Sequence, residues 1–163
     1  YLALGTALAA GALAAAVRFT TPLLFLGVSV LVVVSGVWDA LDGEVARRTG
    51  RATVRGDFLD HVFDRYADLF VLLGIAASGY ADPILALLAL VSLLLTSYMG
   101  TQAQAVGRGR MYGGLVGRAD RLVILAVATF LQFDWSLPWP WAPTRPWESF
   151  AAWGLRFTVL DVA

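Results

Sequence analysis

The chain has 163 residues and a formal net charge of zero, with 59% hydrophobic residues, 15% charged residues and a mean hydropathy of +0.72. A water-soluble domain carries nearer a quarter charged residues, so this composition excludes an ordinary soluble domain and predicts a surface that faces lipid. Cysteine is absent, which excludes disulfides and thiolate metal sites.

Six apolar segments approach the length of about 20 residues that a membrane helix needs. In chain order they span residues 1–17, 22–46, 57–79, 83–106, 118–133 and 147–162. The first and last are short, and we expect both helices to be truncated. Short connections predict a compact, all-α bundle of six transmembrane helices that forms a single domain over residues 1–163.

The orientation of the bundle follows from its arginines, because the chain has no lysine. Cytoplasmic connections of membrane proteins are enriched in basic residues. One set of connections holds Arg47, Arg48, Arg51, Arg55, Arg108, Arg110, Arg118 and Arg121, whereas the opposite set holds Arg18 and Arg145. We therefore expect the first set to face the cytoplasm. The tryptophan-rich residues 133–150 then form an aromatic belt at the other surface.

The second and third predicted helices carry aspartates at helical spacing. Asp39 and Asp42 are three residues apart, and Asp60 and Asp64 are four apart, so each pair shares a helix face. Neighbouring antiparallel helices would bring all four carboxylates together near the cytoplasmic surface. Such a group cannot stay fully ionised without a cation. Oxygen ligands alone favour Mg²⁺ or Mn²⁺, which in such a place commonly serves phosphate chemistry.

The alternative is that the acids of this stretch form surface salt bridges with its arginines. That alternative does not explain why small residues lie among the acids. Two further acids, Asp57 and Asp68, extend the same face of the third helix. They either orient a ligand or Arg65, or make polar contacts between helices. We expect His61 to be an interfacial polar residue, and Glu44 to be solvated or paired with Arg48.

The whole stretch reads Asp39-x2-Asp42-Gly43-x2-Ala46-Arg47-x8-Gly56-x3-Asp60-x3-Asp64. It resembles the signature of the CDP-alcohol phosphotransferases, also called CDP-alcohol phosphatidyltransferases, at every defined position. Eight defined residues at fixed spacing make this a specific signal. The resemblance implies a six-helix membrane enzyme that moves a phosphoryl-linked lipid group from a CDP-alcohol to an acceptor hydroxyl and releases CMP.

Site roles follow from the resemblance position by position. It implies that Asp39, Asp42, Asp60 and Asp64 bind the metal, and that Asp64 is the general base that takes the proton of the acceptor. The CDP pocket would comprise Asp42, Gly43, Ala46, Arg47 and Gly56. Family resemblance also implies a homodimer in the cell membrane, with a CDP-activated lipid donor and no nucleic-acid partner.

The acceptor pocket is predicted from the arginines that precede and begin the fifth helix. Arg118 and Arg121 are three residues apart and Arg108 lies in the same cytoplasmic segment, so their guanidinium groups can converge on a phosphate. The alternative is ordinary positive-inside charge against lipid headgroups. Inositol phosphate and glycerol phosphate both suit such a pocket, and serine suits it less. The inositol-phosphate branch of the family often has basic residues where this chain has Gly100 and Gln102.

Two other kinds of membrane protein also carry aspartates within the bilayer. A magnesium-dependent membrane prenyltransferase typically needs aspartate motifs on two separate helix pairs, whereas this chain has one acid cluster. An ion channel or transporter with an acidic path needs acids distributed through the membrane depth. Here the acids crowd at one side, and the fourth predicted helix carries no acid, only uncharged polar residues such as Ser92, Thr96 and Ser97.

Overall fold

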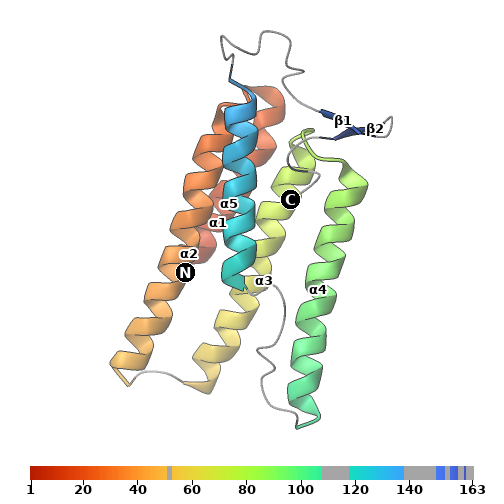
Figure 1. The fold of residues 1–163 in the computed structure, drawn as a ribbon. Coiled ribbons are helices and arrows are strands. Elements are labelled where there is room, and N and C mark those ends of the chain that lie inside the picture. The colour runs from red at the N-terminus through yellow and green to blue at the C-terminus, as the bar shows by residue number, and fades with distance from the viewer. Residues whose placement is uncertain (51–52, 108–117, 138–149, 153–154, 158–159, 161–163) are drawn as a thin grey trace.

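The computed structural model describes residues 1–163 except 51–52, 108–117, 138–149, 153–154, 158–159 and 161–163. Its described part is a bundle of α-helices with a short β-hairpin at one end (Figure 1). The elements are α1 (Leu2–Ala16), the 3-10 helix η1 (Val17–Phe19), α2 (Leu24–Arg48), α3 (Val54–Ala77), α4 (Pro83–Ala105), α5 (Arg118–Trp135), β1 (Phe150–Ala152) and β2 (Leu155–Phe157).

The first five predicted helices are confirmed, with ends that differ from the prediction by a few residues. The prediction of a sixth helix over residues 147–162 is wrong at Phe150–Ala152 and Leu155–Phe157, which pair as antiparallel strands with Phe150 opposite Phe157. The segment is short, and the aromatic residues Phe150 and Phe157 favour extended backbone. Its apolar character alone does not distinguish a helix from a strand.

Three described helical segments are long and apolar enough to cross a membrane: Leu2–Phe19, Leu24–Arg48 and Pro83–Ala105. They indicate an integral membrane protein, although the expected six spans are not found among the described residues. Helix α3 is as long as these segments but carries several charged residues along its length. Helix α3 can therefore lie within a membrane only if its charged side chains pair with groups of neighbouring helices.

The helix ends follow local sequence signals. The side chain of Asp82 accepts hydrogen bonds from the backbone N–H groups of Ile84 and Leu85, and Pro83 occupies the first turn of α4. Helix α2 ends before Gly50, whose φ of +64° belongs to the left-handed region that glycine adopts without strain. These signals set the start of α4 and the end of α2.

Helix α1 packs against both α2 and α3, and small residues make the α3 contact close. Ala7, Ala10, Gly11 and Ala14 are the buried residues of α1. A Cβ atom at Gly11 would collide with the backbone carbonyl of Phe70, and one at Gly74 would collide with the backbone of Gly11. The two backbones are therefore in direct contact, which is how small residues drive helix association in membranes.

Hydrogen bonds between helices tie α2 to its neighbours. The Ser35 hydroxyl donates to the carbonyl of Ala3 on α1, and the Ser29 hydroxyl donates to the carbonyl of Ala126 on α5, each at 2.8 Å. Such bonds satisfy polar groups that lipid cannot, so they help to fix the rotation of each helix. Helix α2 is thereby fixed against α1 and α5 at the same time.

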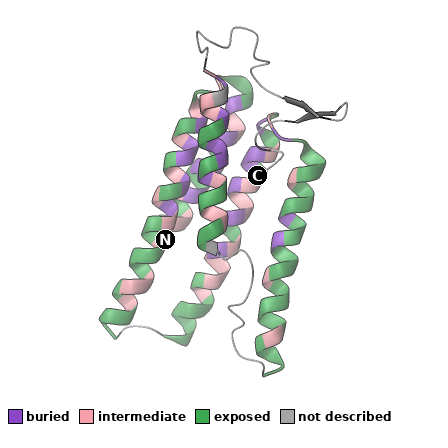
Figure 2. Cartoon of the chain, in the orientation of Figure 1, coloured by how far each residue is buried: buried purple, intermediate pink, exposed green. Residues whose placement is uncertain are grey.

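Burial is uneven along the bundle. Buried residues gather where α1, α2, α3 and α5 pack together, whereas α4 and the joined ends of α2 and α3 are mostly exposed (Figure 2). Figure 1 shows these joined ends extending beyond α5, which begins at about half the height of the bundle. The aspartate-rich halves of α2 and α3 therefore lie at the open end of the bundle.

The Gly11–Gly74 contact predicts a sharp difference between two glycines of one helix. Gly11→Ala must separate the α1 and α3 backbones, and we expect it to lower the stability by about 1–3 kcal/mol. Gly5→Ala is the matched control, because a Cβ there meets nothing within 4 Å. Unfolding of the purified protein in detergent measures both variants. Equal stabilities of the two variants would contradict the close contact.

Candidate active site

Three of the predicted metal ligands come together between α2 and α3. Asp39 lies on α2, and Asp60 and Asp64 lie one turn apart on α3. One carboxylate oxygen from each residue lies within 4.8 Å of those of the other two. The convergence that the sequence spacing predicted is thus present for these three residues.

The three carboxylates differ in their access to solvent. Asp60 is exposed, Asp39 is half-buried and Asp64 is only 5% exposed. The group is therefore open on the side of Asp60 and closed on the side of Asp64. A small ion or a substrate would approach from the open side, and Asp64 would meet the part of it that reaches furthest in.

The spacing of these oxygens suits a hard divalent cation. Magnesium binds oxygen at about 2.0–2.1 Å in octahedral geometry, so oxygens on one ion are about 3 Å apart when adjacent and about 4.2 Å apart when opposite. Oxygens that lie within 4.8 Å of one another would meet one ion after the carboxylates turn inward. Three carboxylates held this close repel one another, and a cation removes that repulsion.

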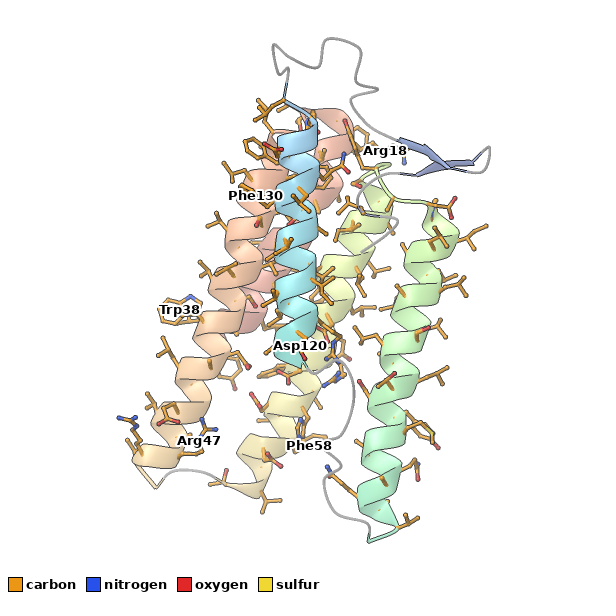
Figure 3. The ribbon with its side chains drawn as sticks, viewed as in Figure 1. Arg18, Trp38, Arg47, Phe58, Asp120 and Phe130 are labelled. Atoms are coloured by element: carbon orange, nitrogen blue, oxygen red, sulfur yellow. The ribbon has the colours of Figure 1, made fainter. Side chains whose placement is uncertain are left out.

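Asp42, the fourth predicted ligand, lies outside this group of three. It is exposed and lies one turn nearer the end of α2 than Asp39. The side chain of Arg47 folds back along the same turn, and its guanidinium would be 3.3 Å from a Cβ placed at Gly43. Its guanidinium donates to Glu44 at 2.8 Å. Figure 3 shows Arg47 on the end of α2 that extends beyond α5.

The small residues Gly56 and Ala46 of the motif lie near the helix ends next to the carboxylates. Gly56 lies in the first turn of α3, where its N–H donates to the side chain of Thr53 at 3.0 Å. A Cβ on Gly56 would lie 3.1 Å from that hydroxyl oxygen. Gly56 thus favours the capped start of the helix that carries Asp60 and Asp64. Ala46 is half-buried in the last turns of α2.

A second charged group lies one turn beyond Asp64 on α3. Asp68 is 1% exposed and accepts a hydrogen bond from Arg121 of α5 at 3.2 Å. Arg65 lies 3.7 Å from the same carboxylate oxygen and donates to Ser97 of α4 at 2.5 Å. The four residues link α3, α4 and α5, so we name them the Asp68 network.

The Asp68 network places one predicted acceptor residue close to the three-carboxylate group. Arg121 lies in the first turns of α5, and Figure 3 shows Asp120, its neighbour, at the start of that helix. Arg118 begins α5, and its side chain is outside the described part of the chain, as is the whole of Arg108. Of the three predicted acceptor arginines, Arg121 is therefore the one whose contacts are known.

Other charged residues largely follow the sequence interpretation. Arg48 donates to Glu44 at 2.6 Å, which confirms that predicted pair, and Arg47 shares the same carboxylate. His61 is half-exposed and lies 3.9 Å from Asp57. These pairs are exposed to solvent and contribute little stability. The contact of Ser97 with Arg65 was not predicted, because no local spacing relates α3 to α4.

The chain also matches a model of a known protein family. The model of the CDP-alcohol phosphatidyltransferase family matches residues 4–160, which is nearly the whole chain. No solved structure matches the chain.

Several curated proteins are similar to the chain. An archaetidylinositol phosphate synthase of Methanothermobacter thermautotrophicus is 39% identical over 108 residues, covering 64% of this chain and 55% of the relative. A phosphatidylinositol phosphate synthase of Mycobacteroides abscessus is 34% identical over 138 residues, covering 81% of this chain and 62% of the relative. The inner membrane protein YnbA of Escherichia coli is 31% identical over 117 residues, covering 69% of this chain and 58% of the relative. The chain thus spans between half and two thirds of the length of these relatives.

The three-carboxylate group predicts divalent-cation binding that can be measured without substrate. Mn²⁺ bound to the detergent-solubilised protein, followed by electron paramagnetic resonance, should be lost in Asp39→Asn and in Asp60→Asn, because each removes an ionised ligand. Asp57→Asn is the matched control on the same helix, since Asp57 is outside the group. Unchanged Mn²⁺ binding in both ligand variants would contradict the site.

Proposed function

Because the chain belongs to the CDP-alcohol phosphatidyltransferase family, we propose that it transfers a phosphatidyl-type group from a CDP-activated lipid to the hydroxyl of a phosphorylated alcohol, with release of CMP. The observation that carries this proposal is the convergence of Asp39, Asp60 and Asp64 within 4.8 Å at the open end of the bundle. The proposed catalytic unit is a single domain over residues 1–163.

Inositol phosphate is the first candidate acceptor. Two of the similar proteins are named for the synthesis of an inositol phosphate lipid, one with an archaetidyl group and one with a phosphatidyl group. Glycerol phosphate is the second candidate, because Gly100 and Gln102 stand where the inositol-phosphate branch often has basic residues. Both acceptors carry a phosphate that arginines of the α5 region can bind.

The reaction joins the acceptor oxygen to the lipid-bearing phosphorus and breaks the phosphoanhydride bond to CMP, which leaves with the bonding electrons. We assign Asp64 as the general base that takes the proton of the acceptor hydroxyl. Its burial on the closed side of the group supports this role, since a base must lie where the reacting hydroxyl arrives. Asp60 lies on the open side, away from where the hydroxyl would arrive, and we assign it to cation binding alone.

The proposed cofactor is Mg²⁺, with Mn²⁺ as a substitute, held by Asp39, Asp60 and Asp64 together with Asp42. A bound divalent ion offsets the negative charge of the diphosphate and stabilises the leaving phosphate. The exposed position of Asp42, one turn from Asp39, supports a ligand that turns inward with the nucleotide. Asp42 is accordingly assigned to both the metal and the CDP pocket.

The CDP pocket is assigned to Gly43, Ala46, Arg47 and Gly56 along with Asp42. The lack of side-chain bulk at Gly43 leaves the space that the Arg47 guanidinium now fills. Arg47 is exposed and paired with Glu44, an interaction of small energy that a diphosphate can replace. Arg47 is therefore assigned to the diphosphate, which its forked donors suit.

The enzyme is proposed to act as a homodimer in the cell membrane with its active site facing the cytoplasm. The arginines at the joined ends of α2 and α3 support this orientation, because basic residues favour the cytoplasmic side. The names of the two synthases support a donor that carries either an archaetidyl or a phosphatidyl group.

Release of CMP tests the reaction itself. Purified protein with a CDP-lipid, Mg²⁺ and inositol phosphate or glycerol phosphate should release CMP, and EDTA should abolish the release. Asp64→Asn removes the base, and we expect the rate to fall by about 10²–10⁴-fold. Asp57→Asn should retain the wild-type rate. Failure of the wild type to release CMP with every acceptor tested would refute the proposed function.

The acceptor pocket is tested by a change in Arg118. Loss of a charge-assisted hydrogen bond costs about 1.5–3 kcal/mol, so Arg118→Ala should raise the KM for the phosphorylated acceptor by about 10–100-fold. The KM for the CDP-lipid should stay the same. Arg48→Ala is the control, since Arg48 is exposed and pairs with Glu44. Equal increases in both KM values would remove Arg118 from the acceptor pocket.

A further inference from the structure

Asp68 is a buried acid to which the proposed reaction assigns no role. It lies one turn beyond the proposed base on α3 and is 1% exposed. A buried carboxylate is costly unless it is paired, and here two guanidinium groups meet one of its oxygens, Oδ2. We propose that Asp68 is a positioning residue that holds Arg121 and Arg65 beside Asp64, where they bind the phosphate of the acceptor. This inference rests on the proposed function.

The charges of the Asp68 network support an anion site. Two guanidinium groups, those of Arg65 and Arg121, meet one oxygen of Asp68. They meet it one helical turn from Asp64, on the closed side of the site. Guanidinium groups from two helices are the donors that suit a phosphate.

Arg121 has a hydrogen-bond donor that Asp68 does not use. It reaches Asp68 through Nη2, while its buried Nε–H has no hydrogen-bond acceptor among the described residues. The arginine side chains remain 19% and 29% exposed for Arg121 and Arg65, so neither is sealed from a ligand. A phosphate that binds Arg121 would accept hydrogen bonds from the N–H groups that Asp68 does not use. Two parallel N–H···O bonds of this kind are typical of guanidinium groups.

The network also fixes the direction of each arginine. Arg65 is held on its other side by Ser97 of α4, and Arg121 comes from α5. Asp68 is therefore the point at which donors from α3 and α5 are brought to one place. The four-residue step from Asp64 to Asp68 is one helical turn, about 5.4 Å. That rise matches a small acceptor whose hydroxyl meets Asp64 while its phosphate meets the arginines.

The test compares binding with turnover in Asp68→Asn, which keeps the shape of the side chain and removes its charge. We expect the Kd for inositol phosphate and for inorganic phosphate, measured by calorimetry on the detergent-solubilised protein, to rise about tenfold or more. The KM for the acceptor should rise with it, whereas the KM for the CDP-lipid should not change. Asp134→Asn is the matched control, because Asp134 is a partly buried acid at the opposite end of α5.

Two results would overturn the positioning role. One is a lower kcat with an unchanged Kd for the acceptor, and the other is an equal rise in both KM values. If Asp68→Asn does not fold, Asp68→Glu keeps the ion pair but moves the arginines by one methylene. It should weaken acceptor binding without changing the KM for the CDP-lipid, and wild-type acceptor binding in Asp68→Glu would also overturn the inference.

The two proposals fail in different ways. Absence of CMP release by the wild type would refute the transferase reaction, while the binding of inorganic phosphate would still report on the arginines. Normal CMP release by the wild type, with acceptor affinity unchanged by every change at Asp68, would leave the transferase reaction intact and refute the positioning role.

Discussion

The contact between the backbones of α1 and α3 is the constraint on which the rest of the bundle depends. Gly11 and Gly74 meet without any side chain between them, and α1 also packs along α2. Helix α1 therefore sets the separation of the two helices that carry the aspartates. Because α1 packs against both helices, its position brings Asp39 of α2 within reach of Asp60 and Asp64 of α3. Two glycines without functional side chains thus help to determine the positions of the carboxylates.

Three acids lie one turn apart along one face of α3. Asp60 and Asp64 face the space shared with Asp39, and one turn later Asp68 faces arginines of α3 and α5. Asp68 therefore has positive counterparts within the chain, whereas the three carboxylates suit a cation. The acids of this region favour a metal ion, and the arginines favour an anion.

The sequence predicted the helices and the acid cluster because both depend on local spacing. Apolar runs located α1 to α5, and the four-residue step between Asp60 and Asp64 placed both on one face. The contact of Asp68 with Arg121 could not be predicted, because it depends on how α5 is rotated and where it meets α3. The sixth helix failed for a related reason: hydrophobicity indicates burial or contact with lipid, but over so short a segment it does not distinguish a helix from a strand.

The ion pair between α3 and α5 also bears on how the protein enters the bilayer during synthesis. A lone aspartate or arginine at the centre of a membrane helix costs about 2.5–3.5 kcal/mol to insert. Asp68 is made more than fifty residues before Arg121, so the ribosome delivers the acid long before its cross-helix partner. Until α5 follows, α3 has Arg65 alone to offset the charge of Asp68. We therefore expect α3 to be fully stabilised in the membrane only after α5 has been made and packs against it.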